Sequence, residues 1–285
     1  MPGSIPGCAM SRPERRGRGG LRGAALLLGV LVLLSLFGPR ASPYSYSALD
    51  WRHLAVPPGF AGEHWLGTDS LGRDLYVRTL YGLRLSLLIG VLASGVSVLI
   101  GVAWGAAAGW VGGRLDAWMM RVVDVLYALP YLFIVLILAA LFGRGNLAVL
   151  LVGIGAVGWL TLARVVRAQT LSLKRREFIE AARATGLSGA QVLWRHVLPN
   201  LAGTVAVYAT LLVPQMIVYE SFLSFLGLGV EPPRASLGSL INAGARQMLS
   251  APWLLLVPAT VLVLLLLAFN LLGDGLRDVL DPTGR

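Results

Sequence analysis

The chain has 285 residues, of which 56% are hydrophobic and only 13% are charged, and its mean hydropathy is +0.73. A soluble globular domain has about a quarter of its residues charged, so this composition excludes an ordinary soluble domain and indicates an integral membrane protein. The net charge of +10 is divided among short segments between apolar runs, which is typical of a membrane protein with a basic bias and argues against a nucleic-acid partner.

The N-terminal region consists of a basic tail and a first apolar run. Residues 1–22 contain five arginines together with glycine and proline, and we expect them to form a disordered cytoplasmic tail. Residues 23–37 are apolar but few for a membrane span, and their flanks are also compatible with a signal peptide. Because no good cleavage site follows near Ala41-Ser42-Pro43, we expect residues 23–38 to be retained as an anchor helix.

Residues 39–84 form a polar segment that we expect to lie outside the cytoplasm. Asp69 and Arg73, and likewise Asp74 and Arg78, are acid–base pairs four residues apart, which favours a short interfacial helix leading into the membrane. The residues alone leave open whether this region is only a salt-bridged helix or has a functional role. A dense motif, L-G-T-D-x-x-G-R-D followed by G-x-R-x-S-L, is carried by Leu66, Gly67, Thr68, Asp69, Gly72, Arg73, Asp74, Gly82, Arg84, Ser86 and Leu87.

Five further apolar runs lie at residues 85–111, 122–142, 147–163, 201–225 and 253–272. Each is near the roughly 20 residues that a helical span requires. Together with the anchor, these runs predict an all-α integral membrane protein with six transmembrane helices. With the N-terminus in the cytoplasm, sixteen of the 24 basic residues fall on the cytoplasmic side, as the positive-inside rule requires. Both termini and residues 164–199 are therefore expected in the cytoplasm.

Two acids and a proline within the apolar runs are candidates for a transport path or for helix packing. Asp124 lies near the cytoplasmic end of its run, and Glu220 lies toward the outer end of its run. Acidic residues inside spans are functional candidates, but both of these lie close enough to an interface to be structural ion pairs or hydrogen-bonded groups between helices. Pro130 is expected inside a span, where neighbouring helices compensate for its missing N–H.

Residues 180–199, which read E-A-A-R-A-T-G-L-S-G-A-Q-V-L-W-R-H-V-L-P, are too charged to cross a bilayer and predict two short helices. Gly186 is suited to the left-handed residue that ends a first helix. Ser188 and Gln191 form a capping box for a second helix, which is expected to run to Leu198 and to be interrupted by Pro199. The first helix is expected to have Phe178, Ala181, Ala182 and Thr185 on one face, with Glu177, Glu180 and Arg183 exposed.

This arrangement of E-A-A, glycine and L-P resembles the coupling loop of the membrane subunits of ABC importers. The match is carried by Glu180, Ala181, Ala182, Gly186, Leu198 and Pro199, whereas His196 stands where that family usually has an aliphatic residue. In that family the loop docks into a groove of a cytoplasmic ATPase, and the resemblance implies polar contacts from Arg175, Arg176, Glu180 and Arg183. The alternative is an ordinary amphipathic cytoplasmic loop.

The motif at residues 66–87 is similar to that of a narrower family, the second permease subunit of the dipeptide, oligopeptide and nickel importers. The sequences E-S-F-L-S-F-L-G-L-G at 220–229 and N-L-L-G-D-G-L-R-D at 270–278, followed by Asp281-Pro282, extend this resemblance. It implies a type I ABC importer permease fold with cytoplasmic coupling helices, a five-helix core at 85–272 and a cytoplasmic tail at 273–285. It also implies a bacterial cytoplasmic membrane, a homologous second permease subunit, two ATPase subunits or domains, and an external substrate-binding protein.

We expect no cofactor or metal on this chain. Lys174 is the only lysine and no phosphate-binding loop precedes it, so the resemblance assigns ATP and Mg²⁺ to the partner ATPases. The single cysteine, Cys8, excludes an intrachain disulfide. The alternatives are a secondary carrier driven by an ion gradient, which would need inverted repeats and midplane acids, and an intramembrane enzyme, for which we find no catalytic constellation. Peptides are the expected cargo, with nickel and small glycosides or opines left open.

Overall fold

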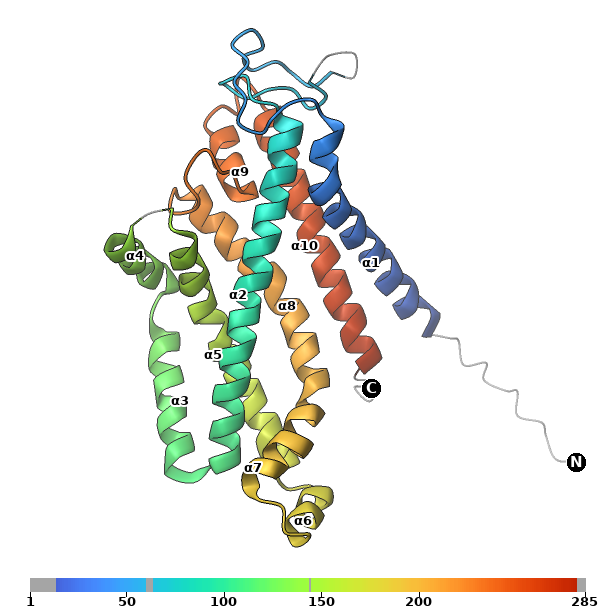
Figure 1. The fold of residues 1–285 in the computed structure, drawn as a ribbon, viewed down its shortest axis with the longest axis vertical. Coiled ribbons are helices and arrows are strands. Elements are labelled where there is room, and N and C mark those ends of the chain that lie inside the picture. The colour runs from blue at the N-terminus through green and yellow to red at the C-terminus, as the bar shows by residue number, and fades with distance from the viewer. Residues whose placement is uncertain (1–13, 60–63, 144, 281–285) are drawn as a thin grey trace, which may run out of the picture.

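A computed structural model of the chain describes residues 14–59, 64–143 and 145–280. Over these residues the chain is built almost entirely from helices, which lie side by side along one long axis (Figure 1). The elements in chain order are α1 (Glu14–Phe37), the 3₁₀ turn η1 (Gly38–Ala41), α2 (Leu75–Val111), α3 (Gly113–Ala128), α4 (Tyr131–Phe142), α5 (Leu147–Leu173), α6 (Glu177–Ala184), α7 (Gly189–Val192), the π-helical segment η2 (Leu193–Val197), α8 (Leu198–Phe225), α9 (Leu237–Ala245) and α10 (Trp253–Leu280).

The two ends of the molecule differ in character. Residues 42–59 and 64–74, in the segment between η1 and α2, lie together with α9 at one end (Figure 1). The short helices α6 and α7 lie at the opposite end. The beginning of α1 and the end of α10 point toward the end that carries α6 and α7. The expected placement of both chain ends on the side of the loop at 164–199 is consistent with this arrangement.

Five of the described helices are long and apolar enough to cross a membrane, and a sixth span results if α3 and α4 are counted as one broken span. These two helices meet at an angle of 83°. The expected span over 122–142 is therefore broken in the structure, because Leu129 is extended and Pro130 comes directly before α4. Proline disfavours a helical conformation of the residue before it, so the chain bends at this point.

Three expected boundaries also differ from the structure. Helix α1 begins at Glu14, so the predicted disordered tail is wrong from that residue to residue 22, and residues 1–13 lie outside the described part. Helix α10 extends to Leu280, so residues 273–280 continue the last helix instead of forming a tail. The predicted interfacial helix is the first part of α2 itself, which begins at Leu75 and runs on without interruption.

Among the described residues, α2 and α5 form the helix pair with the most extensive contact. Gly101, Gly105 and Gly109 lie four residues apart on α2, and all three face α5. A methyl group at Gly109 would lie 2.8 Å from the carbonyl oxygen of Arg167 and from Cβ of Thr170. Such stripes of small residues allow two membrane helices to approach until their backbones nearly touch. The glycine- and alanine-rich composition of residues 85–111 is typical of a helix that packs closely against others.

Candidate functional site

The polar loop at residues 164–199 folds into a corner that projects from one end of the helices. Helix α6 ends at Thr185, and Gly186 follows with φ +88°, a conformation that side chains with a Cβ rarely adopt. The Ser188 side chain accepts a hydrogen bond from the N–H of Gln191, whose side chain accepts one from the N–H of Ser188. The glycine corner and the capping box therefore lie where the sequence predicts them. We call residues 175–197 the α6–α7 corner.

The buried face of α6 differs from the expected face. Ile179 and Ala182 are buried, and they pack in the same core cluster as Val192 of α7. Phe178 is 42% exposed, and Ala181 is also exposed. The prediction that Phe178, Ala181, Ala182 and Thr185 form the buried face is thus wrong except for Ala182. The three- and four-residue spacing allowed either face, and packing against α7 buries the one that contains Ile179.

The second part of the corner continues into α8 instead of ending at Pro199. The N–H of Leu198 donates to the carbonyl oxygen of Leu193, five residues earlier, as in a π-helical turn. Proline has no N–H, and its ring collides with the carbonyl four residues before it in a regular α-helix. The wider turn avoids this collision, and the Asn200 side chain donates to the carbonyl of His196. The predicted interruption at Pro199 is therefore a π-helical segment within one continuous helix of residues 189–225.

Trp110, the penultimate residue of α2, connects the corner to the rest of the molecule. The Arg183 guanidinium of α6 lies 4.9 Å from the centroid of an indole ring of Trp110, and Lys174 lies 5.7 Å from it. The Lys174 ammonium also donates to the carbonyl oxygen of Trp110. On the other side of the corner, Gly189 is close enough that a methyl group there would contact the indole. Trp110 was not recognisable as a functional residue from the sequence, because a tryptophan at the end of an apolar run is an ordinary interfacial residue.

An ion pair braces the same end of the bundle. The Arg167 guanidinium of α5 donates through Nε and Nη2 to the two carboxylate oxygens of Asp116 on α3. Asp116 is 8% exposed. A bidentate pair of this kind fixes the orientation of both side chains. The two residues are 51 positions apart in the chain, which is why no local spacing in the sequence indicated the pair.

Of the residues expected to contact an ATPase, those on the surface of the corner are available to a partner. Arg175, Arg176, Glu180, Ala181 and Arg183 are exposed, as is Trp194 at 71%. Gly186 forms the turn, Ala182 is buried, and Leu198 and Pro199 begin α8.

The motif at residues 66–84 organises the opposite end of the molecule. Asp69 and Arg73 form an ion pair of 2.7 Å, but within a turn and not within the predicted helix. Asp74 caps α2 by accepting a hydrogen bond from the N–H of Val77. Gly67 and Gly72 have φ +80° and +73°, and a methyl group at Gly72 would overlap the backbone of Asp50.

Thr68 and Arg84 occupy different surroundings within this motif. The Thr68 hydroxyl is buried, accepts from the N–H of Val56 and donates to the carbonyl of His53. It therefore holds the chain around His53 in place. Arg84 is exposed and lines a cavity of about 300 Å³ together with Tyr46, Tyr81 and Arg234.

The two acids within the apolar runs have different environments. Glu220 of α8 is fully buried and accepts hydrogen bonds from Ser86 of α2 (2.8 Å) and Ser224 (2.7 Å). Ser86 in turn accepts from the N–H of Leu237 at the start of α9, so Glu220 joins three helices. Asp124 is exposed and pairs with Arg164 of α5 at 2.9 Å. Pro130 lies at the break between α3 and α4. These contacts favour helix packing for Glu220 and an accessible ion pair for Asp124.

A polar groove lies between α5, α8 and the last turns of α10. Its volume is about 470 Å³. Its walls include Gln169, Asn200, Thr204, Tyr208 and Arg277.

Comparisons with known proteins identify a matching family and several related membrane proteins. Residues 97–285 match the family model described as binding-protein-dependent transport system inner membrane component. The oligopeptide transport system permease protein OppC of Escherichia coli (strain K12) is 48% identical over 267 residues, which cover 93% of this chain and 88% of that protein. The corresponding protein of Haemophilus influenzae is 47% identical over 260 residues, covering 91% and 83%. The dipeptide transport system permease protein DppC of Bacillus subtilis (strain 168) is 44% identical over 262 residues, covering 90% and 81%.

Proposed function

The chain belongs to the family of binding-protein-dependent transport system inner membrane components, and we propose that it carries oligopeptides or dipeptides across the membrane. It is a multi-pass permease subunit of an ABC importer, and ATP hydrolysis takes place on separate subunits. The family membership removes the secondary carrier as an alternative. The peptide cargo is a proposal that rests on what the related proteins are named for.

The proposed coupling role rests on the structure of the α6–α7 corner. Its exposed residues include the charged Arg175, Arg176, Glu180 and Arg183 and the aromatic Trp194. Aromatic and arginine side chains are enriched at protein-binding surfaces. Gly186 and the capping box fix its shape, and Trp110 fastens it to α2. We infer that an ATPase subunit binds this surface and that ATP and Mg²⁺ are bound by that subunit.

The proposed orientation follows from this assignment. The α6–α7 corner and both chain ends face the cytoplasm of a bacterial inner membrane, and residues 42–74 face outward. A substrate-binding protein would then deliver cargo at the end formed by residues 42–74 and α9. A homologous second permease subunit completes the path, and two ATPase subunits or domains drive the cycle.

We further propose that the polar groove between α5, α8 and α10 is part of this chain's share of the path. Thr204 and Tyr208 of α8 supply polar groups where a span facing lipid would be apolar. A cysteine at Thr204 in a Cys8→Ser background should react with a water-soluble thiol reagent, and the reaction should slow when cargo is present. A cysteine at Gly95, which lies on an open face of α2, is the matched control and should not respond to cargo. Equal reaction at both positions would contradict this assignment.

The function is tested by peptide uptake into proteoliposomes that contain this chain with its partner subunits. Gly186→Pro should abolish uptake and peptide-stimulated ATP hydrolysis, because proline is fixed near φ −65° and cannot form the corner. Gly186→Asn is the matched control: asparagine tolerates a positive φ, and no atom lies within 4 Å of the added Cβ, so activity should be retained.

Two results would contradict different parts of the proposal. If both Gly186 variants transport normally, the corner does not couple ATP hydrolysis to transport. If the intact importer takes up nickel or a glycoside but no peptide, the coupling role stands and the proposed cargo is wrong.

A further inference from the structure

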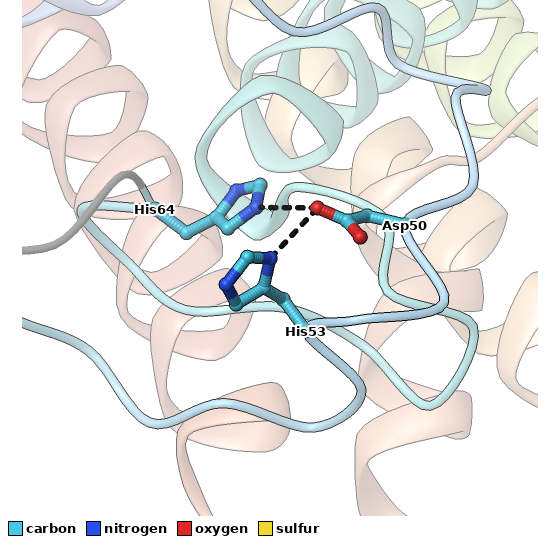
Figure 2. A group of neighbouring side chains, drawn as sticks. All are labelled: Asp50, His53 and His64. Atoms are coloured by element: carbon cyan, nitrogen blue, oxygen red, sulfur yellow. Dashed lines mark hydrogen bonds and ion pairs between the residues drawn. The ribbon is translucent and has the colours of Figure 1, made fainter.

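The side chains of Asp50, His53 and His64 gather in the segment between η1 and α2 (Figure 2). This segment lies at the end of the molecule opposite the α6–α7 corner (Figure 1). The His53 Nδ1 atom lies 2.8 Å from the Oδ2 atom of Asp50, and the His64 Nε2 atom lies 3.8 Å from the same oxygen. One ligand atom from each residue lies within 4.8 Å of the other two. An aspartate carboxylate is ordinarily ionised at neutral pH, so Asp50 can offer an anionic oxygen to a cation.

The His64 ring is held by a second carboxylate. His64 is 5% exposed, and its Nδ1 atom lies 2.7 Å from Oδ2 of Asp74. Asp74 is itself fixed as the N-cap of α2. Because an ionised carboxylate only accepts hydrogen bonds, Nδ1 of His64 must carry the proton of this contact. The Nε2 atom of a neutral ring then has a free lone pair directed away from Asp74.

The Nε2 atom of His64 is one of the few buried polar atoms without a hydrogen-bond partner in the described part of the chain. It faces the Asp50 carboxylate, so two groups that can both accept a hydrogen bond lie opposite each other (Figure 2). Their separation of 3.8 Å is too long for a hydrogen bond. It does fit two ligand atoms that are each about 2.0–2.2 Å from one shared cation.

We propose that Asp50, His53 and His64 bind a divalent transition-metal ion, with Zn²⁺ as the ion that suits the donor set best. Two imidazole nitrogens and one carboxylate oxygen are typical zinc ligands, and a fourth position remains for water. The His53 ring is half exposed, so its Nε2 can carry the proton in water while Nδ1 binds the ion. Asp74 acts as the outer carboxylate that orients His64, as in carboxylate–histidine–zinc arrangements.

The role of this ion is structural. His64 is joined through Asp74 to the first turn of α2, whereas Asp50 and His53 belong to a separate stretch of the connecting segment. The bound ion fastens that stretch to the membrane helix. The close packing of Gly72 on the Asp50 backbone and the hydrogen bond from Thr68 to the His53 carbonyl already place the ligands. The segment is thus preorganised for the ion, and the ion stabilises the outward-facing surface of the chain.

The test is metal binding by the full-length chain in lipid nanodiscs, in a Cys8→Ser background and with a purification tag that contains no histidine. Co²⁺ is the spectroscopic probe, and Zn²⁺ affinity is measured by competition against it. The wild-type ligand set should bind one equivalent of Co²⁺ with the visible absorption of a four-coordinate nitrogen and oxygen site. Replacement of the half-exposed ligand, His53→Ala, should remove this absorption. His196→Ala alters the third and last histidine of the chain, in the α6–α7 corner, and should leave it unchanged.

Asp74→Asn separates metal binding from folding. Asparagine caps a helix as well as aspartate does, so α2 should keep its N-terminus. Its amide, however, can donate a hydrogen bond to Nδ1 of His64, which favours the tautomer with the ring proton on Nε2, the atom that must bind the metal. The affinity should fall by about 10- to 100-fold, as is usual for loss of an outer-shell partner.

The proposal is overturned if the wild-type chain binds no stoichiometric ion, or if His53→Ala and His196→Ala bind Co²⁺ equally. The cluster would then be a histidine–carboxylate pair held by a proton only. Helix content and elution volume of each variant show whether it has folded, so loss of binding in a folded His53→Ala protein is attributable to the missing ligand.

Discussion

The packing of α2 on α5 leads to a prediction with a matched control in the same helix. A methyl group at Gly105 would overlap the carbonyl oxygen of Ala163, and it would lie 2.9 Å from Cβ of Val166 and 3.0 Å from the backbone nitrogen of Arg167. None of these atoms belongs to the end of a flexible side chain. Gly105→Ala therefore requires the two helices to separate by about 1 Å to restore ordinary contact distances. Gly95 of the same helix has no atom within 4 Å of the added methyl group.

The two substitutions should have opposite effects on stability. Alanine is favoured over glycine in a helix by up to about 1 kcal/mol, and Gly95→Ala should gain part of this. At Gly105 the same gain is opposed by overpacking, which costs about 1–3 kcal/mol. The net loss of up to about 2 kcal/mol should lower the midpoint of thermal unfolding by up to about 8 °C for a chain of this size.

The measurement is thermal unfolding of the full-length chain in lipid nanodiscs, combined with peptide uptake by the assembled importer. We expect Gly105→Ala to lower both the unfolding midpoint and uptake, and Gly95→Ala to leave uptake unchanged. A Gly105→Ala protein as stable and as active as Gly95→Ala would refute the close contact between α2 and α5. Equal destabilisation by both would mean that glycine is needed in α2 for a reason other than this contact.

Three further predictions concern buried and interfacial contacts. Glu220→Ala leaves two serine hydroxyls without their acceptor, so it should destabilise the chain by about 1–3 kcal/mol per hydroxyl in thermal unfolding, whereas Glu220→Gln keeps an acceptor and should cost less. Trp110→Ala removes the ring beneath Arg183, and because such contacts contribute about 0.5–2 kcal/mol each, peptide-stimulated ATP hydrolysis should fall several-fold, with Trp110→Phe retaining most of it. Asp116→Asn weakens the pair with Arg167, which is partly exposed, and should lower the free energy of unfolding by about 1–2 kcal/mol in thermal unfolding. In an Arg167→Gln background the same substitution should have no such effect, because the pair is already broken.

Local chemistry explains why parts of the structure could be predicted from the sequence. The Gly186 corner and the Ser188 capping box depend only on residues within three or four positions of each other, and both are found where expected. The close approach of α2 to other helices follows from its small residues in the same way. The long, specific motifs supported the family assignment, which the comparisons confirm.

The errors arose where one residue has two acceptable local solutions. Pro130 was expected inside a span, and it lies at a bend of 83° between α3 and α4. Pro199 was expected to interrupt a helix, and it is instead accommodated by a π-helical turn. Both outcomes accommodate a proline, which has no N–H to donate and whose ring collides with a regular helical turn. The choice between them depends on packing against neighbouring helices. The same applies to α6, where Ile179 and not Phe178 is buried.

The residues that the sequence did not reveal are those whose partners are remote in the chain. Asp116 pairs with Arg167 across 51 positions, and Trp110 contacts Lys174 across 64. These two contacts, together with the Gly101–Gly109 stripe, join α2, α3 and α5 at the end that carries the α6–α7 corner. Helix α5 leads into α6 after only three residues, and α6 is also fastened to α2 through Trp110. A partner that moves the corner must therefore move the α2–α5 pair with it, since neither helix can slide freely past the other at the glycine contacts.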